Sequence, residues 1–273
     1  FGIGLAVGIT VPIVRARQWS QLAIVAKVVL LAASNLVFYL GVAGKLEQGM
    51  FLGLYSGLYL VLALILAMSR RVLPFFIERG VEESVRLRNN KWVDIGGLVL
   101  FLGFWIADLV RPNGLYVTLF AIGLFILHTL RLLGWHTPGL WKKPLLWSLY
   151  LAYASIIAGF ALKASVYFWN LSPNLAVHAF AVGGIGLMTL GMMARVSLGH
   201  TGRNVFEPSP VLSWVFAVLV IALLARVVLP LFFVAQYKLW VVLSQGFWML
   251  AFLAFVVMYF PVLTRPRVDG ADG

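Results

Sequence analysis

The chain has 273 residues, of which 62% are hydrophobic and only 11% are charged, and its formal net charge is +12. A soluble globular chain carries about 25% charged residues, so this composition excludes an ordinary soluble domain. The basic residues lie mainly between apolar runs, where they set membrane topology and contact anionic headgroups, and we therefore exclude nucleic acid as a partner. Cysteine is absent, which excludes disulfides, thiolate-bound metals and c-type haem attachment.

Apolar runs of about 20 residues recur from end to end, and each can cross a hydrocarbon core about 30 Å thick as a helix. We therefore predict an all-α polytopic transmembrane bundle in the lipid bilayer, with a single integral membrane domain over 1–263 and a polar cytoplasmic tail at 264–273. Because the first apolar run is short and begins without Met, we expect an N-terminally truncated fragment. The predicted helices are a partial one at 1–14 and full ones near 19–43, 50–69, 92–109, 114–133, 144–168, 174–197, 210–235 and 238–263.

The distribution of Lys and Arg predicts the orientation of the bundle. With alternating crossings, many more of them fall on one side than on the other, so the richer side and the C-terminus should be cytoplasmic. Lys163 and Arg226 are expected to snorkel toward the outer face. The richer side carries Arg15, Arg17, Arg70, Arg71, Arg79, Arg86, Arg88, Lys91, Arg131, Lys142, Lys143, Arg195, Arg203, Arg265 and Arg267, and the poorer side carries Lys45, Arg111, Lys163, Arg226 and Lys238.

In the run SRRVLPFFIERG (69–80), the tandem residues Arg70 and Arg71 stand at the predicted inner end of a helix. Such a pair usually anchors topology. Pro74 and the two Phe residues after it predict a turn that re-enters the membrane interface. Acidic residues are scarce inside the helices, and Asp94 and Asp108 stand near the two ends of one predicted helix.

The four His residues fall in different parts of the predicted bundle. His128 and His136 lie near the inner end of the 114–133 helix, His178 lies one turn inside the outer end of the 174–197 helix, and His200 lies just past its inner end. At 1.5 Å per residue, His178 and His200 are about 33 Å apart, so they cannot bind one metal ion. Ionisable residues in membrane helices are functional candidates, and we favour a ligand or proton-relay role for His178 over a structural one.

An α-helical period predicts two faces for the 174–197 helix. Gly184 and Gly191 mark a side on which a neighbouring helix can approach closely. The opposite side should face a pocket, and its Met residues are either core filler, which we favour, or soft metal ligands. That opposite side carries His178, Ile185, Thr189 and Met192. The candidate metal ligands are His178, His200, His128 and Met192.

The sequence Gly199-His200-Thr201-Gly202-Arg203 follows the same helix, and its glycines permit a tight backbone turn. Such a turn can direct His200 and Arg203 at one group. Arg at this position suits a carboxylate or a phosphate, such as a haem propionate or, alternatively, a lipid headgroup.

Three segments resemble motifs of the NnrS family: LAVHAFAVGGIGLMTLGMMARVSLGHTGR (175–203), SRRVLPFFIERG (69–80) and KKPLLWSLYLAY (142–153). The resemblance covers essentially the whole chain. It implies a bacterial inner-membrane protein of about twelve helices that contains haem and copper and is linked to nitric oxide, denitrification and resistance to nitrosative stress. About three N-terminal helices with further potential ligands would then be missing. Tyr150 stands where the family often has His, which weakens the copper assignment more than the haem.

The resemblance implies a haem-binding, and possibly copper-binding, protein of nitric-oxide response or detoxification. A b-type haem would be bound with His178 as its ligand candidate, and a small gaseous ligand such as nitric oxide would be the partner. Two alternatives stay open: a permease for a small ligand or metal, and a non-catalytic subunit or assembly factor with a respiratory-chain or membrane-protein partner. No hydrolase, kinase or dehydrogenase motif is present, so enzymatic activity stays open. The candidate cofactor-binding residues are His178, Arg70, Arg71, Arg195, His200 and Arg203.

Overall fold

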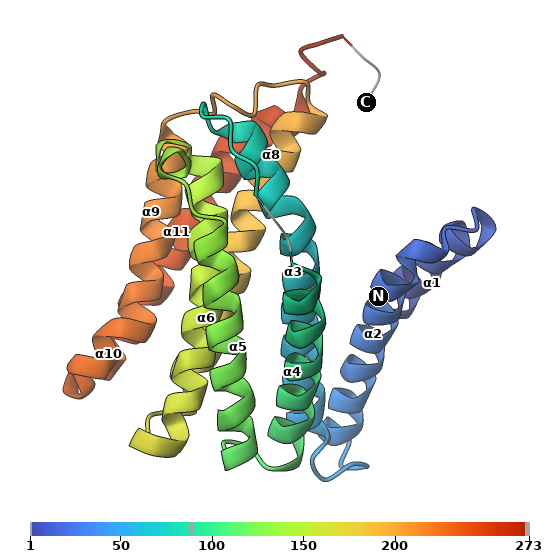
Figure 1. Cartoon of the computed structure of the whole chain (residues 1–273), viewed down its shortest axis with the longest axis vertical. Helices are drawn as coiled ribbons and strands as arrows, with labels where there is room; N and C mark the ends of the chain where they lie inside the picture. Colours follow the sequence, from blue (N-terminus) through green and yellow to red (C-terminus); the bar gives the residue numbers. More distant parts are fainter. Residues whose placement is uncertain (1, 88–89, 271–273) are drawn as a thin grey trace.

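The structure is a computed structural model that describes residues 2–87 and 90–270, so the first residue of the predicted partial helix and the last three of the predicted tail lie outside the described residues. Eight helical stretches in the described part are long and apolar enough to cross a membrane, and they run side by side as a bundle (Figure 1). The predicted all-α polytopic bundle is confirmed. The α-helices are α1 (Gly2–Arg15), α2 (Leu22–Val42), α3 (Gly49–Gly80), α4 (Lys91–Val110), α5 (Leu115–Gly134), α6 (Pro144–Trp169), α7 (Pro173–His178), α8 (Met188–His200), α9 (Val211–Leu223), α10 (Leu229–Phe232) and α11 (Tyr237–Thr264).

Short elements of other helical types join or interrupt these helices. Two of them are π-helical, and both lie within membrane-spanning stretches rather than in loops. The 3₁₀ segments are η1 (Trp19–Gln21), η2 (Pro138–Lys142) and η5 (Val234–Gln236), and the π-helical segments are η3 (Ala179–Leu187) and η4 (Leu224–Val228).

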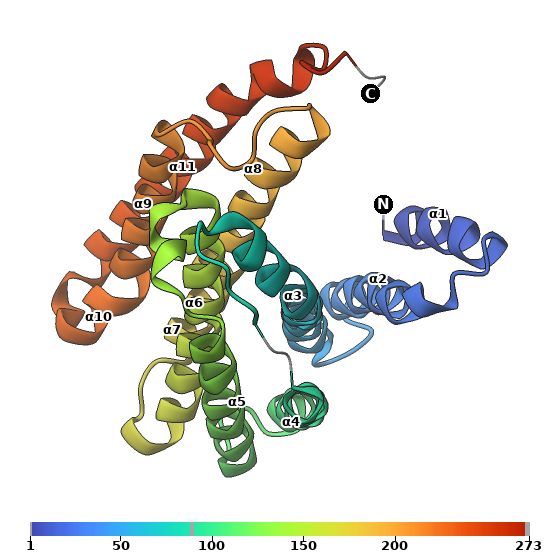
Figure 2. The same ribbon diagram turned by 45° about the horizontal axis from the view of Figure 1, so that its top comes forward.

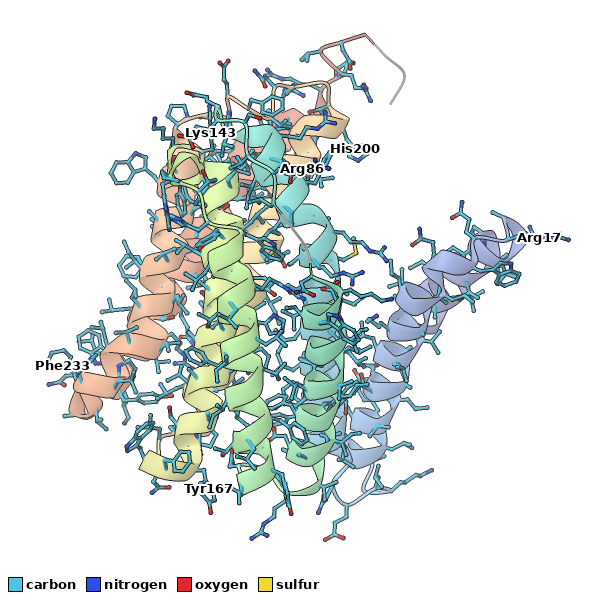
Figure 3. All side chains as sticks on the ribbon, in the orientation of Figure 1. Arg17, Arg86, Lys143, Tyr167, His200 and Phe233 are labelled. Carbon is cyan, nitrogen blue, oxygen red and sulfur yellow. The ribbon has the colours of Figure 1, made fainter. Side chains whose placement is uncertain are left out.

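Helix α6 is the centre of the bundle. It packs against α5, η3, α7 and α8, and 67% of its membrane-spanning window is buried, whereas the corresponding windows of α2 and α11 are only 11% and 17% buried. Figure 2 shows α2 and α11 on opposite sides of the bundle. The C-terminus and His200 lie at one end, which we call the upper end, and Tyr167 and Phe233 lie at the lower end (Figures 1 and 3).

Helix α3 runs without interruption to Gly80, so the turn expected after Arg70 is wrong. Pro74 lies inside the helix, and proline removes only one backbone N–H, a loss that membrane helices tolerate when their neighbours pack well. Leu73 and Ile77 are both 2% exposed, so the helix beyond Arg70 keeps a buried apolar face. Burial of that face outweighs the local turn signal of the proline.

The stretch 173–200 is one continuous helical stretch long enough to span a membrane, but its middle is the π-helix η3. Glycines let this part approach α6 closely, because a Cβ on Gly184 would lie 2.6 Å from Cγ1 of Ile156 and one on Gly191 would lie 2.9 Å from Cδ2 of Leu149. The predicted close-packed glycine side is confirmed. The assumption of an α-helical period is wrong over 179–187, because a π-helix has more residues per turn, and the side chains beyond it are rotated from their predicted positions.

Candidate functional site

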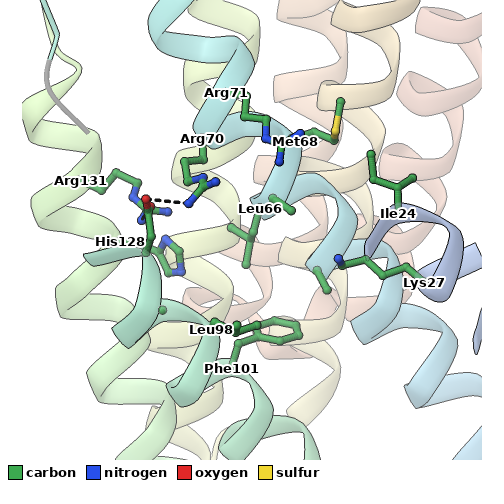
Figure 4. A pocket seen from close by; sticks show the side chains of 14 residues that line it. Ile24, Lys27, Leu66, Met68, Arg70, Arg71, Leu98, Phe101, His128 and Arg131 are labelled. Atoms are coloured by element: carbon green, nitrogen blue, oxygen red, sulfur yellow. Dashed lines mark hydrogen bonds and ion pairs between the residues drawn. The ribbon is translucent and has the colours of Figure 1, made fainter. Parts of the chain in front are cut away.

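A cavity of about 260 Å³ lies among four helices, near the N-terminus of α4 and the C-terminus of α5 (Figure 4). One part of its wall is apolar and the other part is strongly charged. The lining residues are Ile24 and Lys27 of α2; Ala63, Leu66, Ala67, Met68, Arg70 and Arg71 of α3; Asp94, Gly97, Leu98 and Phe101 of α4; and His128 and Arg131 of α5.

An ion-pair network joins three of these helices at the charged part of the cavity. Nη1 of Arg70 lies 2.7 Å from Oδ2 of Asp94, and Nη2 of Arg131 lies 2.6 Å from Oδ1 of the same carboxylate. Asp94 stands in the first turn of α4 and Arg131 in the last turn of α5. Each side chain therefore carries a charge opposite in sign to the partial charge of its own helix end, which is favourable. The network therefore fixes the N-terminus of α4 and the C-terminus of α5 against the second half of α3.

Among the described residues, the cavity wall has more cationic than anionic side chains. Lys27, Arg70, Arg71 and Arg131 are cationic, and Asp94 is the carboxylate among these lining residues. A net positive wall inside a membrane bundle is costly and favours an anionic group on whatever binds there.

His128 lies on the wall of this cavity and is 2% exposed. Its Nδ1 is 2.6 Å from the hydroxyl oxygen of Tyr153, and its ring stacks on Phe160 with centroids 6.1 Å apart. Its Nε2 is enclosed and has no hydrogen-bond partner within the described part of the chain. A buried polar atom without a partner is unusual. An imidazole with one nitrogen held by a neighbour and the other free has the arrangement of a metal-ligating His.

The other predicted His and Met ligands are not brought to this cavity. His178 is half-buried where α7 packs against η4, His200 is exposed at the end of α8, and Met192 is partly buried against the core. Within residues 2–87 and 90–270, no group of three or more His, Asp or Glu side chains could hold a metal ion. The four predicted metal ligands therefore do not form one site.

The predicted Arg residues divide between two places. Arg70 and Arg71 line the cavity, whereas Arg195 is 8% exposed and stacks on Phe76, with its guanidinium carbon 3.8 Å from the ring centroid. Nη1 of Arg203 donates to the carbonyl oxygen of Val262 at 3.3 Å, which ties the turn after α8 to α11. Arg195 and Arg203 thus have protein partners away from the cavity.

A family model described as "NnrS protein" matches residues 1–267 of the chain. The chain belongs to the NnrS family. No curated protein and no solved structure matched it. The resemblance is thereby confirmed over nearly the full length, and the eight apolar helices among the described residues make this NnrS family chain a multi-pass membrane protein.

Tyr150 does not line the cavity. Its hydroxyl donates to the carbonyl oxygen of Leu132 at 3.2 Å, and its ring packs against His136 and Trp141 with centroids 6.0 and 5.7 Å away. Tyr150 therefore has its partners among residues outside the cavity lining.

Sequence reasoning did not select Asp94, Arg131, Lys27 or Tyr153 as site residues of this NnrS family chain. The first three carried a usable signal, because each is an ionisable residue within or at the end of an apolar run. Tyr153 carried none, since a Tyr in an apolar helix is common and only the packing of α5 on α6 places it beside His128.

A second polar cluster lies near the lower end of the bundle. Nζ of Lys163 is 2.9 Å from Oδ1 of Asp108, and the two side chains are only 3% and 0% exposed. The hydroxyl of Tyr59 donates to Oδ2 of Asp108 at 2.5 Å, and the backbone N–H of Asn113 donates to Oδ1 at 3.2 Å. The expectation that Lys163 snorkels is wrong, because Asp108 on α4 offers it a buried counter-ion.

Proposed function

We propose that this NnrS family chain binds a b-type haem in the cavity beside His128 and serves the response to nitric oxide, or its detoxification, in the bacterial inner membrane. The observation that carries the proposal is the enclosed Nε2 of His128, with Nδ1 held by Tyr153, on the wall of a net positive cavity. Family membership supports the link to nitric oxide.

The chemical groups that line the cavity are of the types that bind a haem. The neutral Nε2 of His128 would be the iron ligand, and the Tyr153 hydroxyl would accept from Nδ1–H and hold the ring in that tautomer. Arg70 and Arg71 would hold propionate groups, since guanidinium binds carboxylate through paired hydrogen bonds. When bound, haem supplies an iron that takes a diatomic ligand. The cavity volume of about 260 Å³ is below the range of about 300–1,000 Å³ that is typical of ligand pockets, so part of a haem would lie outside it.

Copper does not fit the described residues in the same way, because they offer no cluster of three His or carboxylate ligands. Copper binding therefore stays a prediction that elemental analysis of the purified protein decides.

Absorption spectra of the purified full-length protein test the haem proposal. We expect a Soret band that shifts on reduction and again on addition of nitric oxide. His128→Ala should remove the band or shift its position, whereas the matched variant His178→Ala should retain it. Loss of the band in His178→Ala but not in His128→Ala would instead identify His178, in the lower half of the bundle, as the haem ligand. Absence of haem from the wild-type protein would overturn the proposal.

A further inference from the structure

We infer that a small pocket beside Arg195, at the upper end of the bundle, binds one anionic oxygen of a phosphate group. The pocket lies where α3 ends and α6 begins, next to α8. It is lined by Gly80, residues 143–146, Arg195 and residues of the segment 205–208. None of these lining residues belongs to the cavity beside His128, so this second site is independent of the proposed function.

Three segments whose sequences resemble NnrS motifs meet at this pocket. They are 69–80 with Gly80, 142–153 with Lys143, and 175–203 with Arg195. Gly80 lets the end of α3 lie closely against the start of α6, because a Cβ at this position would be only 2.9 Å from Cδ1 of Leu146. Close packing of the three segments therefore places two cationic side chains, those of Lys143 and Arg195, at one pocket.

The Arg195 side chain is a buried cation without an anionic partner. It is 8% exposed, and its guanidinium stacks on the ring of Phe76. Within the described part of the chain, no oxygen accepts a hydrogen bond from it, whereas the buried Lys163 has Asp108 as its counter-ion. Stacking covers the face of the guanidinium plane and leaves the N–H groups at its edge available. Because Arg195 lines the pocket, an anion bound there can accept from these groups.

Lys143 and the N-terminus of α6 add to the positive character of the pocket. Nζ of Lys143, at the upper end in Figure 3, lies 3.5 Å from Oε1 of Glu82, an acid that is 76% exposed and does not line the pocket. The first turn of a helix carries a positive partial charge and N–H groups without an intrahelical acceptor, and Leu145 of this turn lines the pocket. No lining residue, all of them in the described part of the chain, is acidic.

The volume of the pocket restricts the ligand to a group of atomic size. It is about 10 Å³, which is room for about one water molecule. A haem cannot enter, whereas one oxygen of a phosphate can, with the rest of the phosphate outside. Two cations and a helix N-terminus favour phosphate, which guanidinium binds through charge-assisted hydrogen bonds. Its source is either inorganic phosphate or a lipid headgroup, because the ends of membrane helices lie at headgroup level.

Calorimetry with inorganic phosphate tests the site in the full chain, purified in an uncharged detergent that contains no phosphate. The wild type is compared with Arg195→Gln and with Arg79→Gln. Arg79 is the matched control, because its guanidinium also stacks on a ring of α3, that of Phe75 at 5.2 Å, but does not line the pocket. We expect Arg195→Gln to weaken binding about tenfold or more and Arg79→Gln to leave it unchanged. Phosphate held in the cavity beside His128 contributes equally to all three proteins, so their differences report the pocket.

A second arm distinguishes the two sources of phosphate. The same proteins are incubated with dioleoyl phosphatidylglycerol or with a dioleoyl galactolipid that has no phosphate, and native mass spectrometry counts the retained lipid. If a headgroup is the ligand, the wild type retains the phospholipid and not the galactolipid, and Arg195→Gln retains severalfold less phospholipid. If inorganic phosphate is the ligand, lipid retention is equal in all variants and only the calorimetry differs.

A second variant keeps the test independent of the fold at Arg195. Lys143→Gln changes a side chain that is 27% exposed, leaves the stacking on Phe76 intact and should weaken phosphate binding severalfold. The thermal midpoint without phosphate verifies that each variant is folded, and if Arg195→Gln is not, Lys143→Gln decides. Equal binding of both probes by the wild type and the folded variants would overturn the inference.

Discussion

The two polar clusters of the bundle differ in how completely their charges are compensated. Asp108 near the lower end receives hydrogen bonds from Tyr59, Lys163 and the backbone of Asn113, and its charge is matched by a buried ammonium. The cavity near the N-terminus of α4 carries four cations against Asp94 and leaves Nε2 of His128 without a partner within the described residues. A cluster that is complete by itself stabilises the packing of helices, whereas one with excess charge and an unused ligand atom indicates a binding site.

The largest effect is expected from breaking the lower pair. Lys163→Met leaves the carboxylate of Asp108 buried without its cation, which should lower the free energy of unfolding by about 3–5 kcal/mol. Replacing both partners, in Lys163→Met with Asp108→Leu, should recover most of that loss, because no uncompensated charge remains. Unfolding of the full chain in mixed micelles measures both values. A neutral single variant, or a double variant no better than the single one, would contradict a structural role for the pair.

This contrast also shows what the sequence could predict. The all-α, multi-spanning character of the bundle followed from the apolar runs, because membrane thickness sets their length. Arg70, Arg71 and His128 were recognised one by one as candidates, but nothing in the sequence said that they share a cavity. That assembly depends on which faces of α3, α4 and α5 pack together. Residues with the right chemistry were thus predictable, and their grouping was not.

The same limit explains the remaining errors. The pairing of Lys163 with Asp108 joins residues far apart in the chain, so a rule based on each residue alone assigned Lys163 to the membrane surface. The π-helix over 179–187 arises where glycines allow the chain to lie close against α6, and an α-helical period cannot anticipate it. Pro74 is a turn signal whose effect depends on burial of the residues around it.

A smaller loss of stability, together with stronger binding of an anion, is expected when the ion pairs of the cavity are broken. Asp94→Asn removes the carboxylate shared by Arg70, which is 37% exposed, and Arg131, which is only 7% exposed. Because one of the two partners is partly solvated, the loss of unfolding free energy should be about 2–3 kcal/mol. The variant also makes the cavity more positive, so its affinity for inorganic phosphate, measured by calorimetry, should rise severalfold. Glu82→Gln is the control, since Glu82 is an exposed acid paired with Lys143 away from the cavity. Unchanged phosphate binding in Asp94→Asn would contradict the assignment of the cavity as a cationic site.

The smallest effect is expected from the contact between Lys163 and the ring of Tyr55 in the lower cluster. Nζ of Lys163 lies 5.9 Å from the ring centroid of Tyr55, an arrangement in which the aromatic face attracts the ammonium. Tyr55→Leu should therefore lower the unfolding free energy by about 0.5–1 kcal/mol beyond its packing change, while Tyr55→Phe, which keeps the ring, should be close to wild type. In the Lys163→Met background, the difference between Tyr55→Leu and Tyr55→Phe should shrink by about the same 0.5–1 kcal/mol, leaving only the packing part. An equal difference in both backgrounds would mean that Tyr55 acts through packing alone, and that the compensation of Lys163 rests on Asp108.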